Sequence, residues 1–161
     1  MPVLDILNLP AALPAYTPLA GLDIGEKTIG VAVSDLSRTI ASPFSLIRKT
    51  KFTDDAAALF KLMADRGATG LVIGLPVNMD GTEGPRCQSS RAFARNILRL
   101  KDLPIAFWDE RLSSAAINRM LITEADMTRA KRAEVVDRAA AGYILQGALD
   151  RLQSSARQER T

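Results

Sequence analysis

Residues 19–35, LAGLDIGEKTIGVAVSD, decide the fold of this chain. Two short apolar runs, Leu19–Ile24 and Thr28–Val33, are separated by the polar turn sequence Gly25-Glu26-Lys27, and the second run is rich in β-branched residues. Short apolar runs with a turn signal between them are typical of paired β-strands. The sequence therefore predicts a β-hairpin, one strand of which carries an aspartate, Asp23, among aliphatic side chains.

The pattern after this hairpin alternates between helices and strands. Apolar spacing of three to four residues indicates helices, and short apolar runs bounded by glycine or proline indicate strands. The predicted elements are a third strand over Ser42–Lys49, a helix from Asp54 to Gly67, a strand over Leu71–Gly74, a turn-rich loop over Leu75–Pro85, a helix over Ser89–Leu100, a strand over Pro104–Trp108, a helix capped by Ser113 or Ser114, and a last helix over Glu134–Leu152. Because a strand–helix–strand unit makes its two strands parallel, we expect an α/β fold in which helices cover a mixed sheet.

Length and composition predict one domain outside the membrane. A chain of 161 residues corresponds to about one domain, and its apolar runs fall short of the roughly 20 residues that a membrane span needs. We expect a Pro-rich extension over residues 1–18 outside the core, a single domain over 19–153 and a polar tail over 154–161. The single cysteine and the lack of basic residues near the amino terminus favour a cytoplasmic location.

The absence of histidine narrows the possible chemistry. The chain has no His, so a Ser-His-Asp triad, a Cys-His pair and a zinc site of His and Cys are all excluded. The charge is divided unevenly, because residues 1–85 hold 7 basic and 9 acidic side chains, whereas residues 86–161 hold 14 and 9. A basic second half suggests an anionic partner such as nucleic acid.

Three carboxylates occupy otherwise apolar positions. Asp23 interrupts the first strand, Glu110 follows the strand that ends at Trp108, and Asp137 shares a helical stripe with Ala141 and Ile144. A buried carboxylate is stable only when it is paired, protonated or bound to a cation. An ion pair, or plain exposure in the case of Glu110, explains each acid singly, but the three together predict an oxygen-ligand site for one or two Mg²⁺ or Mn²⁺ ions. Such ions can activate water against a phosphodiester without any histidine.

The chain also resembles a known family, the YqgF family, which is also called RuvX. The resemblance runs in order from about Leu19 to Asp150. It rests on GLDIG and IGVAVSD with Lys27 within residues 21–35, GLPVNMDGTEGP at 74–85, DERLS at 109–113, VD at 136–137, AA at 139–140 and IL at 144–145. The resemblance implies a ribonuclease H-like fold with a five-stranded sheet, in which parallel strands extend three antiparallel ones.

The activity that the resemblance implies is that of a cytoplasmic bacterial nuclease proposed to process the 5′ end of pre-16S ribosomal RNA. An earlier proposal for the family is a Holliday junction resolvase. Matched by motif, Asp23, Glu110 and Asp137 take the positions of the three acids of the family, both as catalytic residues and as metal ligands. Glu26 departs from the pattern, because members commonly have a small hydroxyl residue there. The added carboxylate would either repel a phosphate or supply an outer metal ligand.

Basic and polar side chains around the three acids are candidates for contacts with nucleic acid. The glycine-rich loop that contains Asn78 can bring backbone amides close to a phosphate. A polar stretch just before the Asp137 helix is predicted to form a basic loop that clamps the substrate. The predicted nucleic-acid-binding residues are Lys27, Asn78, Arg111, Arg129, Lys131 and Arg132.

Four functions remain open at this point. A nuclease that cleaves structured RNA, with the ribosome or its precursor as a partner, is favoured, and we expect a monomer or a weak homodimer. A resolvase of four-way DNA would use the same acids and would work as a symmetric dimer. A non-catalytic RNA-binding protein would also use a basic face. An ATP-binding module is suggested by the likeness of the first hairpin to sugar kinases, but those proteins close two domains over the nucleotide.

Overall fold

Five strands form one mixed sheet in a computed structural model that describes residues 3–112 and 129–159, with the backbone alone for residues 129–138 and Glu159. The sheet order is β3-β2-β1-β4-β5. The strands are β1 (Leu19–Ile24), β2 (Thr28–Ser34), β3 (Ala41–Arg48), β4 (Gly70–Leu75) and β5 (Ile105–Asp109). The strand β2 pairs antiparallel with β1 and β3, whereas β4 pairs parallel with β1 and β5. The predicted sheet is therefore confirmed, and the strand ends differ from the predicted ones by only a residue or so.

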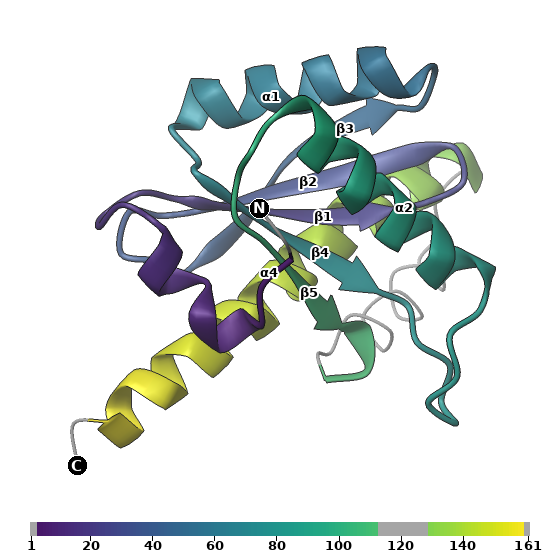
Figure 1. The fold of residues 1–161 in the computed structure, drawn as a ribbon. Helices are drawn as coiled ribbons and strands as arrows, with labels where there is room; N and C mark the ends of the chain where they lie inside the picture. Colours follow the sequence, from purple (N-terminus) through teal and green to yellow (C-terminus); the bar gives the residue numbers. More distant parts are fainter. Residues whose placement is uncertain (1–2, 113–128, 160–161) are drawn as a thin grey trace.

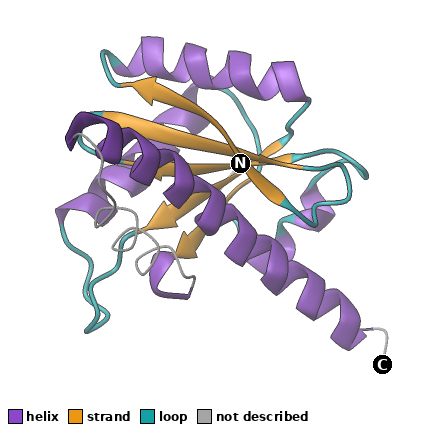
Figure 2. Ribbon diagram, turned by 180° about the vertical axis from the view of Figure 1, so that it is seen from behind, coloured by secondary structure: helices purple, strands orange, loops and turns teal. Residues whose placement is uncertain are grey.

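Helices cover both faces of the sheet. Helices α1 (Phe52–Arg66) and α2 (Pro85–Leu100) lie on one face, and α4 (Arg129–Glu159) crosses the other (Figure 1; Figure 2 shows the α4 side). The described residues also form the short 3₁₀ helices η1 (Ile6–Asn8), η2 (Pro10–Ala12) and η3 (Glu110–Leu112). Among the described helices, none combines the length and the apolar character that crossing a bilayer requires. The helix predicted to begin at Ser113 or Ser114 lies outside the described residues.

Alternating side chains of the central strand build two cores. In β1, Ala20 and Leu22 pack in the core under α1 and α2, whereas Leu19 packs in the core under α4. Gly21 also faces α4, because a Cβ at this position would lie 2.6 Å from Cβ of Leu145. The close approach of α4 to the sheet therefore depends on the absence of a side chain at Gly21. Asp23 follows two residues later, on the same face of the strand.

The Pro-rich amino-terminal stretch contributes to the core, so the prediction that residues 1–18 lie outside it is wrong. Leu9 is fully buried and Leu13 nearly so, both in the core under α4. Leu4 forms a parallel bridge to Ala106 of the edge strand β5. Two 3₁₀ turns follow neither the helical nor the strand period, so the sequence pattern did not reveal which apolar residues face inward.

The last helix is longer than predicted at both ends. It begins at Arg129 rather than at Glu134, so the predicted basic loop with Arg129, Lys131 and Arg132 is instead part of α4. It also continues to Glu159, where a polar tail from residue 154 was expected. Alanine, lysine and arginine favour helices, and a helix already anchored in the core is extended at little cost where no glycine or proline ends it.

Candidate active site

Asp23 lies buried near the carboxyl end of β1, on the face that α4 covers. Its position follows from the alternation of the strand, in which Gly21 packs against Leu145 of the helix. Only 3 % of the Asp23 surface is exposed. The strand thus places a carboxylate at the margin of the core, which agrees with its predicted burial.

Glu110 lies at the same edge of the sheet. It is the first residue of η3, directly after β5, and is 7 % exposed. Parallel pairing sets Leu22 beside Ile73, so Asp23, the next residue, lies near Gly74. Glu110 follows two residues after Trp108, the partner of Gly74, and its Cγ lies 3.4 Å from the position of a Cβ on Gly74. The two predicted acids therefore share the carboxyl edge of the parallel strands, where α/β sheets place their ligand sites.

Gly74 lets Ile144 of α4 and Glu110 lie close to β4. A Cβ on Gly74 would lie 2.5 Å from Cδ1 of Ile144 in α4 and 3.4 Å from Cγ of Glu110. A larger residue at this position would displace Ile144 and crowd the Glu110 side chain. The sequence contained no signal for this role, because a glycine at the end of a strand reads simply as the start of a loop.

The position of Asp137 follows from the direction of α4. Gly142 lies against Pro43, and the backbone N–H of Ala41 donates a 2.8 Å hydrogen bond to Oε1 of Gln146, so α4 runs antiparallel to β3. Because β1 and β3 have the same direction, α4 is also antiparallel to β1. The backbone of α4 before Ala141 therefore runs toward the end of β1 that carries Asp23.

The side chain of Asp137 lies outside the described residues, as do those of Arg129, Lys131 and Arg132. Among the side chains that are described, no group of three acidic, His or Cys residues comes together. Asp23 and Glu110 are thus the described part of the predicted site. The meeting of three carboxylates stays a prediction.

Arg86 faces Asp23, although the sequence analysis did not select it. It is the second residue of α2, and its Nη2 lies 3.9 Å from Oδ1 of Asp23. The helix begins where the loop after β4 ends, so the chain brings the guanidinium back to the carboxyl edge of the sheet. A basic residue just after Gly84-Pro85 was the available signal, since Pro is typical of the first helical position.

The loop between β4 and α2 is held by its own hydrogen bonds. The backbone N–H of Asn78 donates to the carbonyl of Thr82 at 2.9 Å, and its Nδ2 lies 3.0 Å from Oγ1 of Thr82. Gly81 has a φ of 89°, a left-handed conformation that glycine adopts without strain. The Asn78 amide thus stabilises the turn, and its predicted contact with nucleic acid remains a prediction.

Arg111 connects this loop to the strand that precedes Glu110. Its Nε and Nη2 donate to the carboxylate of Asp109, with Nη2 2.7 Å from Oδ2, and its Nη1 donates to the carbonyl of Asn78 at 3.3 Å. The hydrogen bonds from Arg111 hold the pKa of Asp109 below its ordinary value. Arg111 therefore positions the loop beside Glu110, and its predicted contact with nucleic acid stays untested.

Replacement of Asp109 by Asn should lower the acid sensitivity of folding. A carboxyl group whose pKa falls on folding stabilises the protein above its ordinary pKa of 3.8, and that stabilisation is lost as pH falls through the lower folded value. The unfolding temperature of Asp109→Asn should therefore be reduced at neutral pH and decline less steeply in acid. Asp65→Asn, on the exposed surface of α1, is the control, and equal slopes for Asp109→Asn and wild type would contradict the role of the pair.

Lys27 is exposed in the turn between β1 and β2. Its carbonyl accepts a hydrogen bond from the backbone N–H of Lys49, whose Nζ in turn donates to the carbonyl of Gly25 at 3.1 Å. Glu26, the departure from the family pattern, is exposed in the same turn. The turn thus presents one cation, Lys27, and one carboxylate, Glu26, to solvent, within three residues of the end of the strand that carries Asp23.

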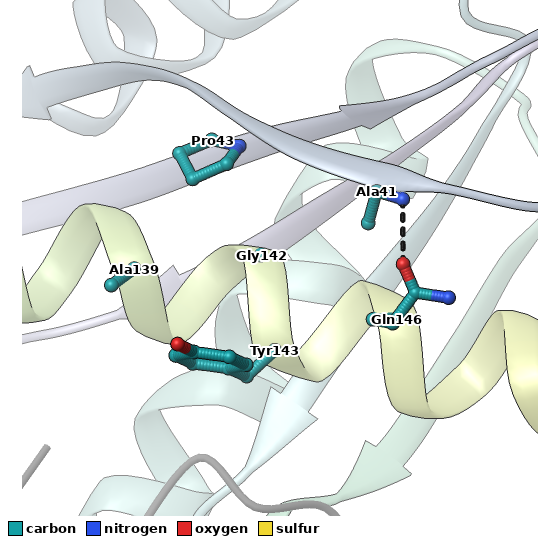
Figure 3. Close-up of a pocket in the computed structure, with 6 residues that line it drawn as sticks. All are labelled: Ala41, Pro43, Ala139, Gly142, Tyr143 and Gln146. Atoms are coloured by element: carbon teal, nitrogen blue, oxygen red, sulfur yellow. Dashed lines mark hydrogen bonds between the residues drawn. The ribbon is translucent and has the colours of Figure 1, made fainter. Parts of the chain in front are cut away.

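A cavity of about 200 Å³ lies elsewhere, between β3 and α4 (Figure 3). The residues that line it are Ala41, Pro43, Ala139, Gly142, Tyr143 and Gln146. None of them is charged, and the hydrogen bond between Ala41 and Gln146 closes one end. Since neither Asp23 nor Glu110 reaches this cavity, we assign it to the packing of the helix on the edge strand.

Comparisons with known proteins agree with this geometry. The RuvX family, described as Holliday junction resolvase, matches residues 17–151. A protein of Phenylobacterium zucineum named "putative pre-16S rRNA nuclease" is 73% identical over 155 residues, 96% of this chain and 99% of that protein. A protein of the same name from Rhodospirillum rubrum is 62% identical over 152 residues, 94% of each chain.

Among solved structures, the chain is similar to RuvC of T. thermophilus in complex with a Holliday junction substrate, with a TM-score of 0.53. The match covers 85% of this chain and 96% of RuvC at 8% sequence identity. At this identity the similarity concerns the fold, and it confirms the predicted ribonuclease H-like architecture.

Proposed function

The chain belongs to the RuvX family, and from this premise we propose that it is a metal-dependent nuclease that processes the 5′ end of pre-16S ribosomal RNA. The observation that carries the proposal is the pair of buried carboxylates, Asp23 and Glu110, at the carboxyl edge of the parallel strands. Near-full-length relatives named as pre-16S rRNA nucleases support this RNA as the substrate.

The residues present fit a hard divalent cation. Asp23 and Glu110 offer carboxylate oxygens, the ligands that Mg²⁺ and Mn²⁺ prefer, and a bound cation would stabilise two buried carboxylates at one edge. In our proposal Asp137 is the third ligand. Asp137 lies four residues, about 6 Å along the helix axis, before Ala141 in α4. Asp23 lies two residues, about 6.7 Å along the strand, after Gly21 in β1. Since Gly21 lies against Ala141 and the two elements are antiparallel, both displacements lead toward the same end of the sheet. One or two bound ions would lower the pKa of a water and stabilise charge on the phosphate.

The chain itself contributes position and shape. Asp23 lies in β1, and Glu110 directly follows β5 at the start of η3, so the sheet positions both carboxylates. The missing side chain of Gly74 lets Ile144 and Glu110 lie close to β4, and the Arg111–Asn78 hydrogen bond fixes the loop beside Glu110. A phosphodiester placed at this edge would meet the acids from the solvent side.

Cleavage assays test the proposal directly. An end-labelled transcript with the pre-16S 5′ leader and a four-way DNA junction are incubated in parallel with Mg²⁺, Mn²⁺ or EDTA, beside an Asp23→Asn preparation as the control for contaminating nuclease. We expect RNA cleavage with either metal, and none with EDTA or in the variant. Cleavage of the junction alone would support the resolvase, the function named for the family. Salt-dependent RNA binding without cleavage would overturn the proposed nuclease activity and favour an RNA-binding protein.

A further inference from the structure

Arg86, at the carboxyl edge of the sheet, forms a long ion pair with Asp23. Arg86 Nη2 lies 3.9 Å from Oδ1 of Asp23, and the Arg86 side chain is 46% exposed whereas that of Asp23 is 4% exposed. The arginine thus covers the solvent side of a buried acid. Its charge is attracted to the carboxylate, but the separation exceeds hydrogen-bond length.

Two other arginines of this fold are held in short, hydrogen-bonded ion pairs. Arg91 binds Glu83 through two bonds of 2.7 and 2.8 Å, and Arg111 holds Asp109 at 2.7 Å. Within the described part of the chain, Arg86 has no hydrogen bond of this kind, and Asp23 is the one acid within ion-pair distance of it. The half-exposed Arg86 side chain is therefore accessible from solvent at the edge of the site.

We propose that Arg86 binds a backbone phosphate of the nucleic acid and holds it beside Asp23. The inference deepens the nuclease function proposed above and rests on it. A planar guanidinium can donate two parallel hydrogen bonds to a phosphate, which a lysine cannot match. A phosphate that approaches buried carboxylates is repelled by them, and a cation on the solvent side offsets that repulsion where the substrate enters.

The geometry distinguishes this role from that of a structural ion pair. A structural pair gains most when it is short and hydrogen-bonded in two places, as in Arg111–Asp109. The Arg86–Asp23 pair is long, and one partner is half exposed. The arginine can therefore turn toward a phosphate without breaking a hydrogen bond to Asp23.

Arg86→Gln tests the proposal, with Arg95→Gln as the matched control. Arg95 is exposed on the same helix and nine residues further on, about 13 Å along the axis. Binding of a fluorescent RNA is measured against salt in Mg²⁺, in a Glu110→Gln background that prevents cleavage. We expect Arg86→Gln to weaken binding several-fold and to lower the slope of log K against log salt by about 0.7 to 0.9, the value for one phosphate contact. Arg95→Gln should leave the slope unchanged, and Arg86→Lys should retain the slope but recover only part of the affinity.

Cleavage kinetics in the protein that retains Glu110 provide a second measurement. Arg86→Gln should raise KM for the RNA more than Arg95→Gln does, with an unchanged circular dichroism spectrum. Equal slopes and equal KM for the two variants would overturn the role of Arg86 even if the wild type cleaves RNA. If the wild type cleaves nothing, the nuclease function fails, whereas the binding slopes still decide whether Arg86 contacts a phosphate.

Discussion

Asp23→Asn should lower the rate of nucleic-acid cleavage by about a thousandfold or more, which corresponds to about 4 kcal/mol of activation free energy. Asparagine has nearly the same size as aspartate but carries no charge, so it cannot replace a carboxylate that binds a cation. The site offers no compensating histidine, since the chain has none. Single-turnover cleavage of the leader transcript at saturating enzyme measures the effect on chemistry separately from binding.

The fold of this variant should remain intact, because the substitution removes a buried charge rather than packing. The melting temperature and the circular dichroism spectrum establish this point. Asp65→Asn, the same change at an exposed position of α1, is the matched control and should cleave at the wild-type rate. Wild-type cleavage by Asp23→Asn would remove this residue, and with it the proposed site, from the mechanism.

Gly21→Ala should destabilise the protein by about 3 kcal/mol, at the upper end of the usual cost of overpacking a core. The added Cβ would lie 2.6 Å from Cβ of Leu145 and 3.3 Å from the carbonyl oxygen of Ala141. Neither atom is the end of a flexible side chain, so the relief of the clash requires α4 to move away from β1. In a chain of this size, the midpoint of thermal unfolding should fall by roughly 6–12 °C.

Chemical denaturation of Gly21→Ala measures this loss, with Gly84→Ala as the control. A Cβ on Gly84 would meet nothing closer than 3.7 Å, and the φ of this residue is −92°, which alanine adopts readily. The control should therefore lose less than about 1 kcal/mol. Because the movement of α4 would also displace Asp137 from β1, we expect cleavage by Gly21→Ala to fall even at temperatures where it is folded. A loss in Gly21→Ala no larger than in Gly84→Ala would show that helix and sheet are not in rigid contact.

Local patterns were sufficient for most of the sheet. Apolar runs separated by turn residues predicted all five strands, and the strand–helix–strand order predicted parallel neighbours for β4 and β5. Asp23 was found because it interrupts an apolar strand and Glu110 because it directly follows one, and both are buried at one edge of the sheet. Such signals need only the sequence, since they arise from the period of a strand and from the cost of burying a charge.

Other features depended on contacts between distant residues. Leu9 and Leu13 enter the core through 3₁₀ turns that have no recognisable period, and α4 begins before its apolar stripe does. Gly74 and Arg86 acquire roles only because β4 lies between β1 and β5 and because α2 returns to the edge of the sheet. The residues next to Gly74 and Arg86 in the sequence do not indicate these roles.

The sequence by itself therefore determined the fold class, the family and two buried acids at the ends of predicted strands, because burial, strand period and motif order are local properties. Only the tertiary structure decided which surfaces meet: that Gly21 lets α4 pack on β1, that Gly74 lets Ile144 of α4 pack on β4, and that Arg86 faces Asp23. These relations depend on sheet order and helix direction, which bring residues more than 60 positions apart to within a few ångströms, and no local pattern encodes such distances.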